Sequence, residues 1–336
     1  MIRLLSAALV ALTVPLAPQG KRAGVRRIAI YMDTGVWAAE AKHALPALLD
    51  WLGHERTYLT AKQIEAGALR KHGARAFDLL VVPGGWAGDY IQKVGGWDAK
   101  RTGDDEIRKF VAAGGGYLGF CAGAFAAART TRWAGHDYAY TWKLFDGRAE
   151  GPLAWNQLRK GGALRAGHGT AELDRTLPEL RGRGLPAIVR PMLYGGPRFV
   201  PRRGKRRPPG WRVLARHGED KTPAIITFRY GGRRGGHVVL SSFHPAVLTG
   251  DHGRLDRDTD TFAWALAGED PDGSAPDWRL AAALVDIALG MPTRKAPALP
   301  SPSKPTPTTK RGRPRRGPAQ GGGRIPRLHE PAAGRR

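Results

Sequence analysis

The single cysteine of this chain, Cys121, stands in a setting that could make it a nucleophile. It is the centre of Gly119-Phe120-Cys121-Ala122-Gly123, after the apolar run 117–120 and before the small residues of 122–129. This pattern predicts a sharp turn from a buried strand into a helix, with the thiol at the positive end of the helix and the Ala122 amide placed to stabilise an oxyanion. The same short pattern fits a tight packing corner around a small buried residue, so both interpretations stay open.

Two further positions could complete a hydrolytic site. Pro83-Gly84-Gly85 ends the apolar segment 77–82, and a glycine amide there could be a second oxyanion donor or simply part of a turn. His244 follows the apolar segment 237–243. Catalytic groups of doubly wound sheets gather at the carboxyl ends of strands, so His244 is a candidate base for Cys121.

Strands and helices alternate through the first part of the chain. The predicted strands cover 25–31, 57–60, 77–82 and 117–120, and the predicted helices cover 37–51, 61–71, 104–113 and 122–129. This alternation predicts an α/β fold with a doubly wound, mostly parallel sheet. Segments 223–230 and 237–243, joined by a Gly-rich turn, predict an antiparallel extension, and 262–266 and 278–289 are predicted to be helices.

Composition divides the chain into three parts. The start, 1–23, joins a short basic segment and the apolar stretch 4–17 to a linker, which resembles a secretory signal peptide, although a buried first element is the alternative. We expect one α/β domain over 24–290. The remainder, 291–336, is rich in Pro, Gly and Arg and predicts a disordered basic tail. Export would place the protein outside the cytoplasm, either secreted or in the periplasm or cell envelope.

The high positive charge of the chain bears on what the protein could bind and not on its fold. The formal net charge is +25, and the tail from Arg294 onward carries twelve Lys or Arg against one acid. A second basic segment, 201–209, lies inside the domain. These segments could contact a polyanion, or could simply be solvated surface; the tail lacks the aromatic residues that stack on single-stranded bases, so sequence-specific nucleic-acid recognition is not expected. One cysteine permits no internal disulfide, and no ligand spacing indicates a metal or other cofactor.

Several motifs together resemble the N-terminal domain of biotin–protein ligases, a class I glutamine-amidotransferase-like family that has free-standing bacterial members. The segments that carry the resemblance are 107–124, Val81-Val82-Pro83-Gly84-Gly85, Leu193-Tyr194-Gly195-Gly196-Pro197-Arg198-Phe199 and Val239-Leu240-Ser241-Ser242-Phe243-His244-Pro245. The resemblance implies a flavodoxin-like sheet with Cys121 as nucleophile and His244 as base. It also implies an oxyanion hole and pocket formed by Gly84, Gly85, Ala122, Gly123, Tyr194, Gly195 and Gly196.

The sequence departs from the superfamily at the third catalytic residue. The acid normally falls two residues after the histidine, and here that position is Ala246. Either another acid replaces it, Asp251 being the nearest in sequence, or the triad is degenerate. The first reading predicts a Cys-dependent hydrolase or amidase acting on a small-molecule or peptide amide; the second predicts a non-catalytic ligand-binding or envelope-scaffold protein. No biotin-adenylating domain is expected among the residues after Pro245.

Overall fold

The computed structural model describes residues 24–292 apart from 99, 141, 157–165, 203, 206 and 248–275. The predicted signal peptide, the predicted helix 262–266 and nearly all of the predicted tail therefore lie outside the described residues. No helix in the described part of the chain is both long and apolar enough to cross a membrane.

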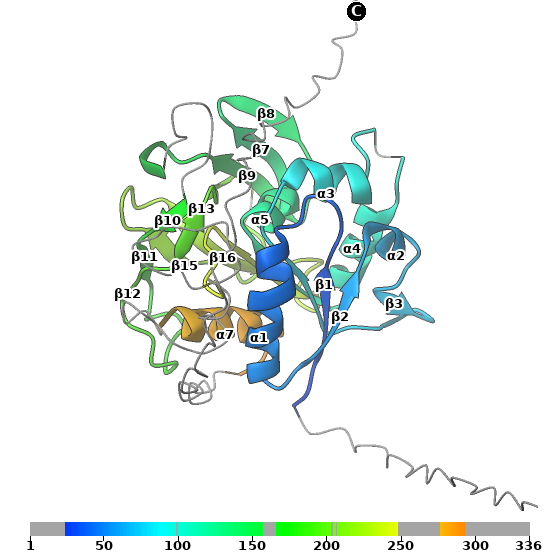
Figure 1. The fold of residues 1–336 in the computed structure, drawn as a ribbon, viewed down its shortest axis with the longest axis horizontal. Helices are drawn as coiled ribbons and strands as arrows, with labels where there is room; N and C mark the ends of the chain where they lie inside the picture. The colour runs from blue at the N-terminus through cyan, green and yellow to red at the C-terminus, as the bar shows by residue number, and fades with distance from the viewer. Residues whose placement is uncertain are drawn as a thin grey trace, which may run out of the picture.

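The centre of the molecule is a nine-stranded sheet with a parallel half and an antiparallel half (Figure 1). Its parallel half runs in the order β2 (Glu55–Leu59), β1 (Arg27–Tyr31), β5 (Leu79–Val82), β6 (Gly116–Phe120) and β17 (His237–Ser241). The antiparallel half continues with β16 (Pro223–Arg229), β15 (Arg212–His217), β11 (Ala171–Leu173) and β12 (Ile188–Val189). The predicted α/β class, with its antiparallel extension, is confirmed.

The inner parallel strands β1, β5, β6 and β17 are largely buried on both faces, which explains their apolar sequences, whereas β2 at the sheet edge is exposed except at Leu59. On β1, Ile28 and Ile30 belong to one core and Ala29 and Tyr31 to the other, because side chains of a strand alternate between faces. The first core is covered by α1 (Leu45–Trp51) and α7 (Pro276–Ala288). The second is covered by α2 (Ala61–Glu65), α3 (Ala87–Val94), α4 (Gly103–Ala112) and α5 (Ala122–Ala127).

Two predicted helices are wrong in extent, and a third is present over its predicted length but with a different internal geometry. The one expected over 61–71 ends at Glu65, because Gly67 adopts a φ of 84° and the chain continues into the short hairpin of β3 (Arg70–Lys71) and β4 (Ala74–Arg75). The one expected over 122–129 ends at Ala127, and strand β7 (Ala128–Trp133) begins at the next residue. The one expected over 37–51 contains a π-helical turn, η1 (Glu40–Ala44), directly before α1. Helix α3 was not predicted.

A four-stranded sheet stands beside the main sheet and was also not predicted. Its order is β14 (Arg198–Pro201), β9 (Phe145–Gly151), β7 (Ala128–Trp133) and β8 (His136–Ala139). A shorter pair, β10 (Ala166–His168) with β13 (Met192–Tyr194), and the 3-10 turn η2 (Ala154–Asn156) complete the described elements.

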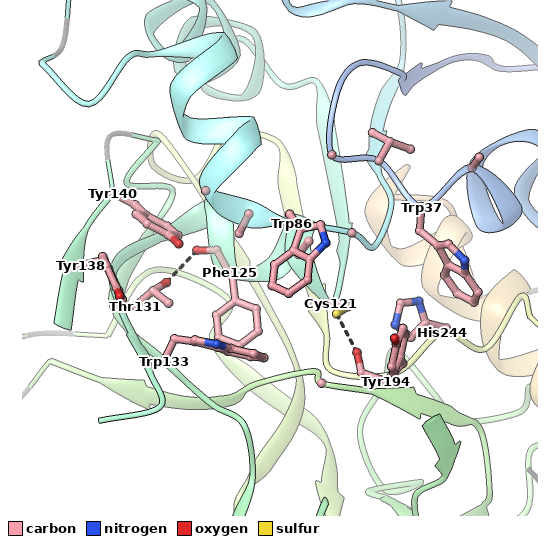
Figure 2. Close-up of a pocket in the computed structure, with 18 of the residues that line it drawn as sticks. Trp37, Trp86, Cys121, Phe125, Thr131, Trp133, Tyr138, Tyr140, Tyr194 and His244 are labelled. Carbon is pink, nitrogen blue, oxygen red and sulfur yellow. Dashed lines mark hydrogen bonds between the residues drawn. The ribbon is translucent and has the colours of Figure 1, made fainter. Parts of the chain in front are cut away.

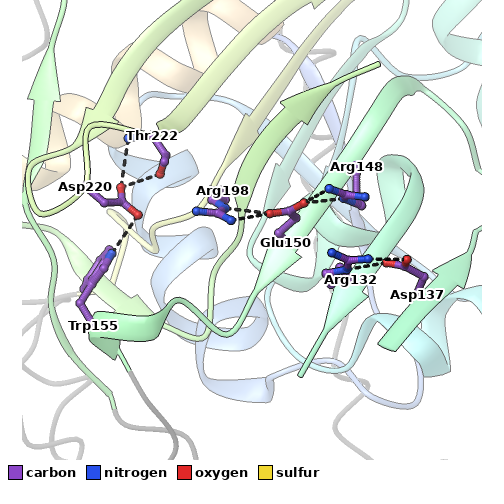
Figure 3. Close-up of polar contacts among 8 residues, drawn as sticks. All are labelled: Arg132, Asp137, Arg148, Glu150, Trp155, Arg198, Asp220 and Thr222. Carbon is purple, nitrogen blue, oxygen red and sulfur yellow. Dashed lines mark hydrogen bonds and ion pairs between the residues drawn. The ribbon is translucent and has the colours of Figure 1, made fainter. Parts of the chain in front are cut away.

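Charged pairs join the strands of the smaller sheet (Figure 3). The buried carboxylate of Glu150 accepts hydrogen bonds from Arg148 on its own strand and from Arg198, its cross-strand partner on β14. Arg132 and Asp137 form a bidentate pair between β7 and β8 on the exposed side. A partly buried carboxylate that two guanidinium groups share, as at Glu150, stabilises the folded state more than an exposed ion pair does.

We expect replacement of Glu150 by Ala to destabilise the protein by about 2 kcal/mol, because two guanidinium groups would lose their common partner. Asp137→Ala, the matched control, breaks the exposed pair and should change stability little. Denaturant unfolding of the two variants measures the difference. Equal stability of both variants would show that the Glu150 contacts do not hold this sheet together.

Candidate functional site

Cys121 occupies the turn between β6 and α5 in a strained conformation. Its φ of 45° and ψ of −104° lie outside the regions that non-glycine residues usually adopt. Its amide donates to Ser241 O at 2.9 Å, and its carbonyl accepts from Phe125 N at 2.9 Å, so the surrounding structure fixes the strain. The predicted strand-turn-helix is therefore present, with Cys121 6% exposed at a cavity.

Glycines allow the turn to pack this closely. A Cβ on Gly123 would lie 2.2 Å from Val82 O, and one on Gly119 would lie 2.7 Å from the backbone of Gly123. Gly123 therefore supports the turn from behind and does not line the cavity. The carbonyl of Gly123 also accepts a hydrogen bond from the Tyr117 hydroxyl at 2.7 Å, which fixes the first turn of α5.

The structure supplies His244 with a carboxylate that the sequence did not indicate. His244 Nδ1 lies 3.0 Å from Glu40 Oε1, although the two residues are 204 positions apart. Both side chains are buried, at 1% and 0% exposure respectively. Ala246, where the superfamily acid was expected, is a buried apolar core residue, and Asp251 lies outside the described residues.

Glu40 reaches this position because two loops pair at the carboxyl edge of the sheet. The segment after β1 meets the segment after β5, with Trp37 N donating to Gly84 O at 2.8 Å and Trp86 N donating to Gly35 O at 2.9 Å. The π-helical turn η1 follows at once and begins with Glu40. Turns of this kind recur at functional sites because they redirect one side chain within a helix.

Gly84 brings Glu40 and His244 together. Its amide donates to Glu40 Oε2, which leaves Oε1 for the imidazole. A Cβ at this position would lie 2.3 Å from His244 Cε1 and 3.1 Å from Glu40 Oε2. The buried Tyr90 hydroxyl holds the same loop by donating to Gly84 O at 2.7 Å. The predicted role of Gly84 as a pocket residue is therefore indirect: it packs behind the His–Glu pair.

The other predicted pocket residues also fall into two groups, those that line the cavity and those that pack behind its wall. Gly85, Ala122, Tyr194 and Gly195 line the cavity together with Cys121 and His244. The amides of Gly85 and Ala122 donate no hydrogen bond to any described residue, so both are available to a developing oxyanion beside the sulfur. Gly196 lies behind the cavity wall, where a Cβ would stand 1.8 Å from Ser242 O.

The protonation of His244 is set by its neighbours. Burial lowers its pKa. The negative charges of Glu40 and of a Cys121 thiolate raise it, and so do the hydrogen bonds that these two groups can form with the imidazole. The net shift is upward. In the arrangement seen here, the Cys121 thiol donates to Tyr194 O at 3.2 Å, and His244 Nε2 has no hydrogen-bond partner among the described residues. A rotation of the S–H bond from Tyr194 O toward Nε2 would start proton transfer.

Aromatic rings form most of the cavity wall (Figure 2). The cavity has a volume of about 370 Å³, and the rings that surround it belong to Trp37, Trp86, Trp97, Phe125, Trp133, Tyr138, Tyr140 and Tyr194. Trp37 stands edge-on to the His244 ring at 5.2 Å between centroids, and Phe125 packs edge-on against Trp133 at 5.5 Å. Strands β7 and β8 thus supply one wall of the site.

Sequence reasoning missed Glu40 and this aromatic wall. One signal was available: Glu40 is the acid on the buried helical face that Trp37, Ala44 and Leu48 also occupy, and buried acids usually have a partner. The aromatic residues of 131–140 carry no motif. No group of three or more His, Cys, Asp or Glu residues with the geometry of a metal site occurs in the described ranges.

Several solved structures are similar to this chain, with TM-scores below 0.5. PurLQS from Thermotoga maritima is 16% identical, with a TM-score of 0.46 and coverage of 78% of this chain and 98% of that one. A structure described as a glutamine amidotransferase is 20% identical (TM-score 0.45; 77% and 98% covered), and a putative ThuA-like protein from Parabacteroides merdae is 13% identical (TM-score 0.43; 83% and 96% covered). These values indicate similarity of fold alone. No curated protein matches the chain.

The family comparison is more specific than these structural ones. The family described as "Biotin-protein ligase, N terminal" matches residues 26–263, which include every residue named above as part of the site. The expected resemblance is confirmed: this chain belongs to the biotin-protein ligase N-terminal family.

Proposed function

We propose that the protein is a Cys-dependent hydrolase of amide bonds, in which Cys121 is the nucleophile, His244 the base and Glu40 the acid that orients it. One observation carries the proposal: a buried imidazole, hydrogen-bonded through Nδ1 to a buried carboxylate, lies beside a cysteine held in a strained turn at a cavity. The amidotransferase-like fold agrees with amidotransferase or hydrolase chemistry.

The proposed reaction has two halves. The raised pKa of His244 favours an imidazolium paired with a Cys121 thiolate; once the thiol proton has passed to Nε2, Sγ attacks the amide carbonyl, and the amides of Gly85 and Ala122 stabilise the tetrahedral oxyanion. The C–N bond then breaks as His244 returns the proton to the departing amine, leaving a thioester on Cys121. A water molecule, deprotonated by His244, hydrolyses the thioester to a carboxylic acid and frees the thiol. Glu40 stabilises the imidazolium in both halves.

We further propose that the substrate is an uncharged amide with an aromatic or other apolar group. None of the described residues that line the cavity is Asp, Glu, Lys or Arg. Free glutamine carries an ammonium and a carboxylate at its α-carbon, and both would lose water in this cavity without gaining a counter-charge. Indole and phenol rings instead favour flat or apolar groups, which they contact over large areas.

A second candidate function is ligand binding without turnover. The observation that favours it is the hydrogen bond from the Cys121 thiol to Tyr194 O, which directs the proton away from His244 Nε2. In that case the aromatic cavity would bind the same class of neutral ligand, and the buried His–Glu pair would serve only to hold the two loops.

Replacement of Glu40 by Gln should lower the rate of Cys121 alkylation by iodoacetamide at least about 100-fold. The Gln side chain can still accept from Gly84, but its amide would donate to Nδ1 and force the proton onto Nε2, where it blocks acceptance from the thiol. His244→Ala should lower the rate similarly, and Glu55→Gln, at the exposed start of β2, should leave it unchanged. An alkylation rate that Glu40→Gln does not alter would remove Glu40 from the mechanism.

The same pair predicts a pH dependence of stability. Because the folded pKa of His244 is raised above the ordinary 6.5, the stability contributed by its charged form is complete below pH 6.5 and is lost as the pH rises toward about 10. The Tm difference between wild type and Glu40→Gln should therefore shrink between pH 6 and pH 10. A constant difference would show that the imidazole does not carry the charge.

Substrate preference separates the two candidate functions. We expect a neutral aromatic amide, such as N-acetyl-phenylalaninamide, to be hydrolysed with kcat/KM at least about 100-fold above that of free glutamine, with Cys121→Ser inactive. Trp133→Ala should raise KM about tenfold, whereas Trp211→Ala, outside the cavity, should not. Thermal stabilisation by the amide without product formation would support the binding function; a preference for glutamine would contradict the proposed substrate class.

We also propose that the protein acts outside the cytoplasm, in the envelope or beyond it. The support is the basic start and apolar stretch 4–17, which resemble a signal peptide. Fractionation of cells expressing the full chain should recover it in the extracytoplasmic fraction, shortened at its amino terminus, and deletion of 2–17 should retain it in the cytoplasm. Uncleaved protein in the cytoplasmic fraction would contradict export.

A further inference from the structure

A second cavity lies at the opposite edge of the central sheet. It has a volume of about 230 Å³ and borders the amino ends of the parallel strands: Arg26 directly precedes β1, Asp78 directly precedes β5, and His237 is the first residue of β17. The end of α7 closes one side, through Ala288 and the residues after it. Cys121 stands at the carboxyl end of β6, so this cavity is separate from the proposed catalytic site.

Positive charge dominates this second cavity. Arg26, Arg75, Arg229 and Arg234 line it, against the single carboxylate of Asp78. No ion pair joins any of these four arginines to a described carboxylate within 4.0 Å. Guanidinium groups that line one cavity without an ion-pair partner repel one another, so an anion bound in the cavity would relieve the repulsion.

Hydrogen bonds within the protein use few of the available donors. A guanidinium carries five N–H groups. Arg75 donates one bond to Gly114 O at 2.7 Å, and Arg229 donates one to Gly235 O at 3.0 Å. Arg26 Nε is buried without a hydrogen-bond partner among the described residues. The two bonds to carbonyls anchor the guanidinium groups at the cavity wall and leave most donors for a ligand.

His237 lines the same cavity, and its pKa reflects its burial and the nearby positive charge. Burial lowers the pKa of His237 to about 4, and the positive charge of Arg229 contributes in the same direction. The ring is therefore neutral at neutral pH and adds a hydrogen-bonding nitrogen without adding to the charge. No described residue of the insertion 201–209, which holds the internal basic cluster of the sequence, lines this cavity.

We propose that this cavity binds a phosphate-type tetrahedral oxyanion, either free or as the phosphate group of a larger molecule. Guanidinium groups match the oxygens of phosphate in pairs, with two parallel N–H···O bonds each. The volume suits one such group with a few water molecules and excludes a folded polymer segment. A larger phosphate-bearing molecule would therefore present one phosphate at this cavity and extend outward.

Titration calorimetry of the full chain with inorganic phosphate, at constant ionic strength set with chloride, tests the proposal. Wild type should bind one phosphate saturably. Arg26→Gln with Arg234→Gln should weaken binding at least tenfold. The matched control, Arg27→Gln with Arg233→Gln, removes the same charge from adjacent residues that do not line the cavity and should retain it. No saturable binding by wild type, or equal weakening in both double variants, would overturn the proposal.

Two further measurements complete the test. Without phosphate, the Arg26/Arg234 variant should melt no lower than the control, because it loses repulsion; a lower Tm would show that these arginines serve the fold instead, and would overturn the proposal. Short-chain polyphosphate distinguishes the source of the ligand. Binding at least tenfold tighter than phosphate, and lost in the same variant, would identify the phosphate of a larger molecule; equal or weaker binding would identify the free ion.

Discussion

The contact between Glu40 and His244 is the constraint on which the site depends. A carboxylate can be buried here only because its two oxygens are both used, one by the Gly84 amide and one by the imidazole. That arrangement needs a residue without a side chain at 84, since a Cβ would collide with the His244 ring. Three features thus serve one purpose, which is to bring an acid to a distant histidine. They are the pairing of the loops after β1 and β5, the π-helical turn and the glycine at 84.

The cavity depends in turn on an element outside the parallel sheet. Strands β7 and β8 belong to the smaller sheet, and they carry Thr131, Trp133 and Tyr138 to the cavity while α5 carries Phe125. Because β7 begins directly after α5, the helix that positions Cys121 also fixes the start of the aromatic wall. Cys121 and the aromatic wall are therefore joined by a few residues of chain, whereas Glu40 and His244 are joined only through tertiary packing.

The sequence predicted what local pattern determines and missed what tertiary contact determines. The turn at Cys121 was predictable because apolar and small residues change over within a few positions, and the hairpin before His244 because glycines separate two apolar runs. The acid was sought near Ala246, where the superfamily places it, but Glu40 comes from the first loop of the fold. No spacing rule links residues 204 positions apart. The smaller sheet was missed because its strands, such as 128–133, mix charged and apolar residues without clear alternation.

The two edges of the central sheet differ in charge, and this difference bears on what can reach the thiol. With a formal charge of +25, the chain as a whole attracts anions. At the carboxyl edge, however, the described cavity lining contains no Lys or Arg, so an anion entering it would lose its hydration without gaining an ammonium or guanidinium partner. At the amino edge, four arginines offer that partner. Long-range attraction therefore favours the approach of an anion to the cavity beside Cys121, whereas local desolvation opposes its entry. Desolvation has the larger effect on entry, because salt screens the attraction between surface charges but does not reduce the cost of desolvation.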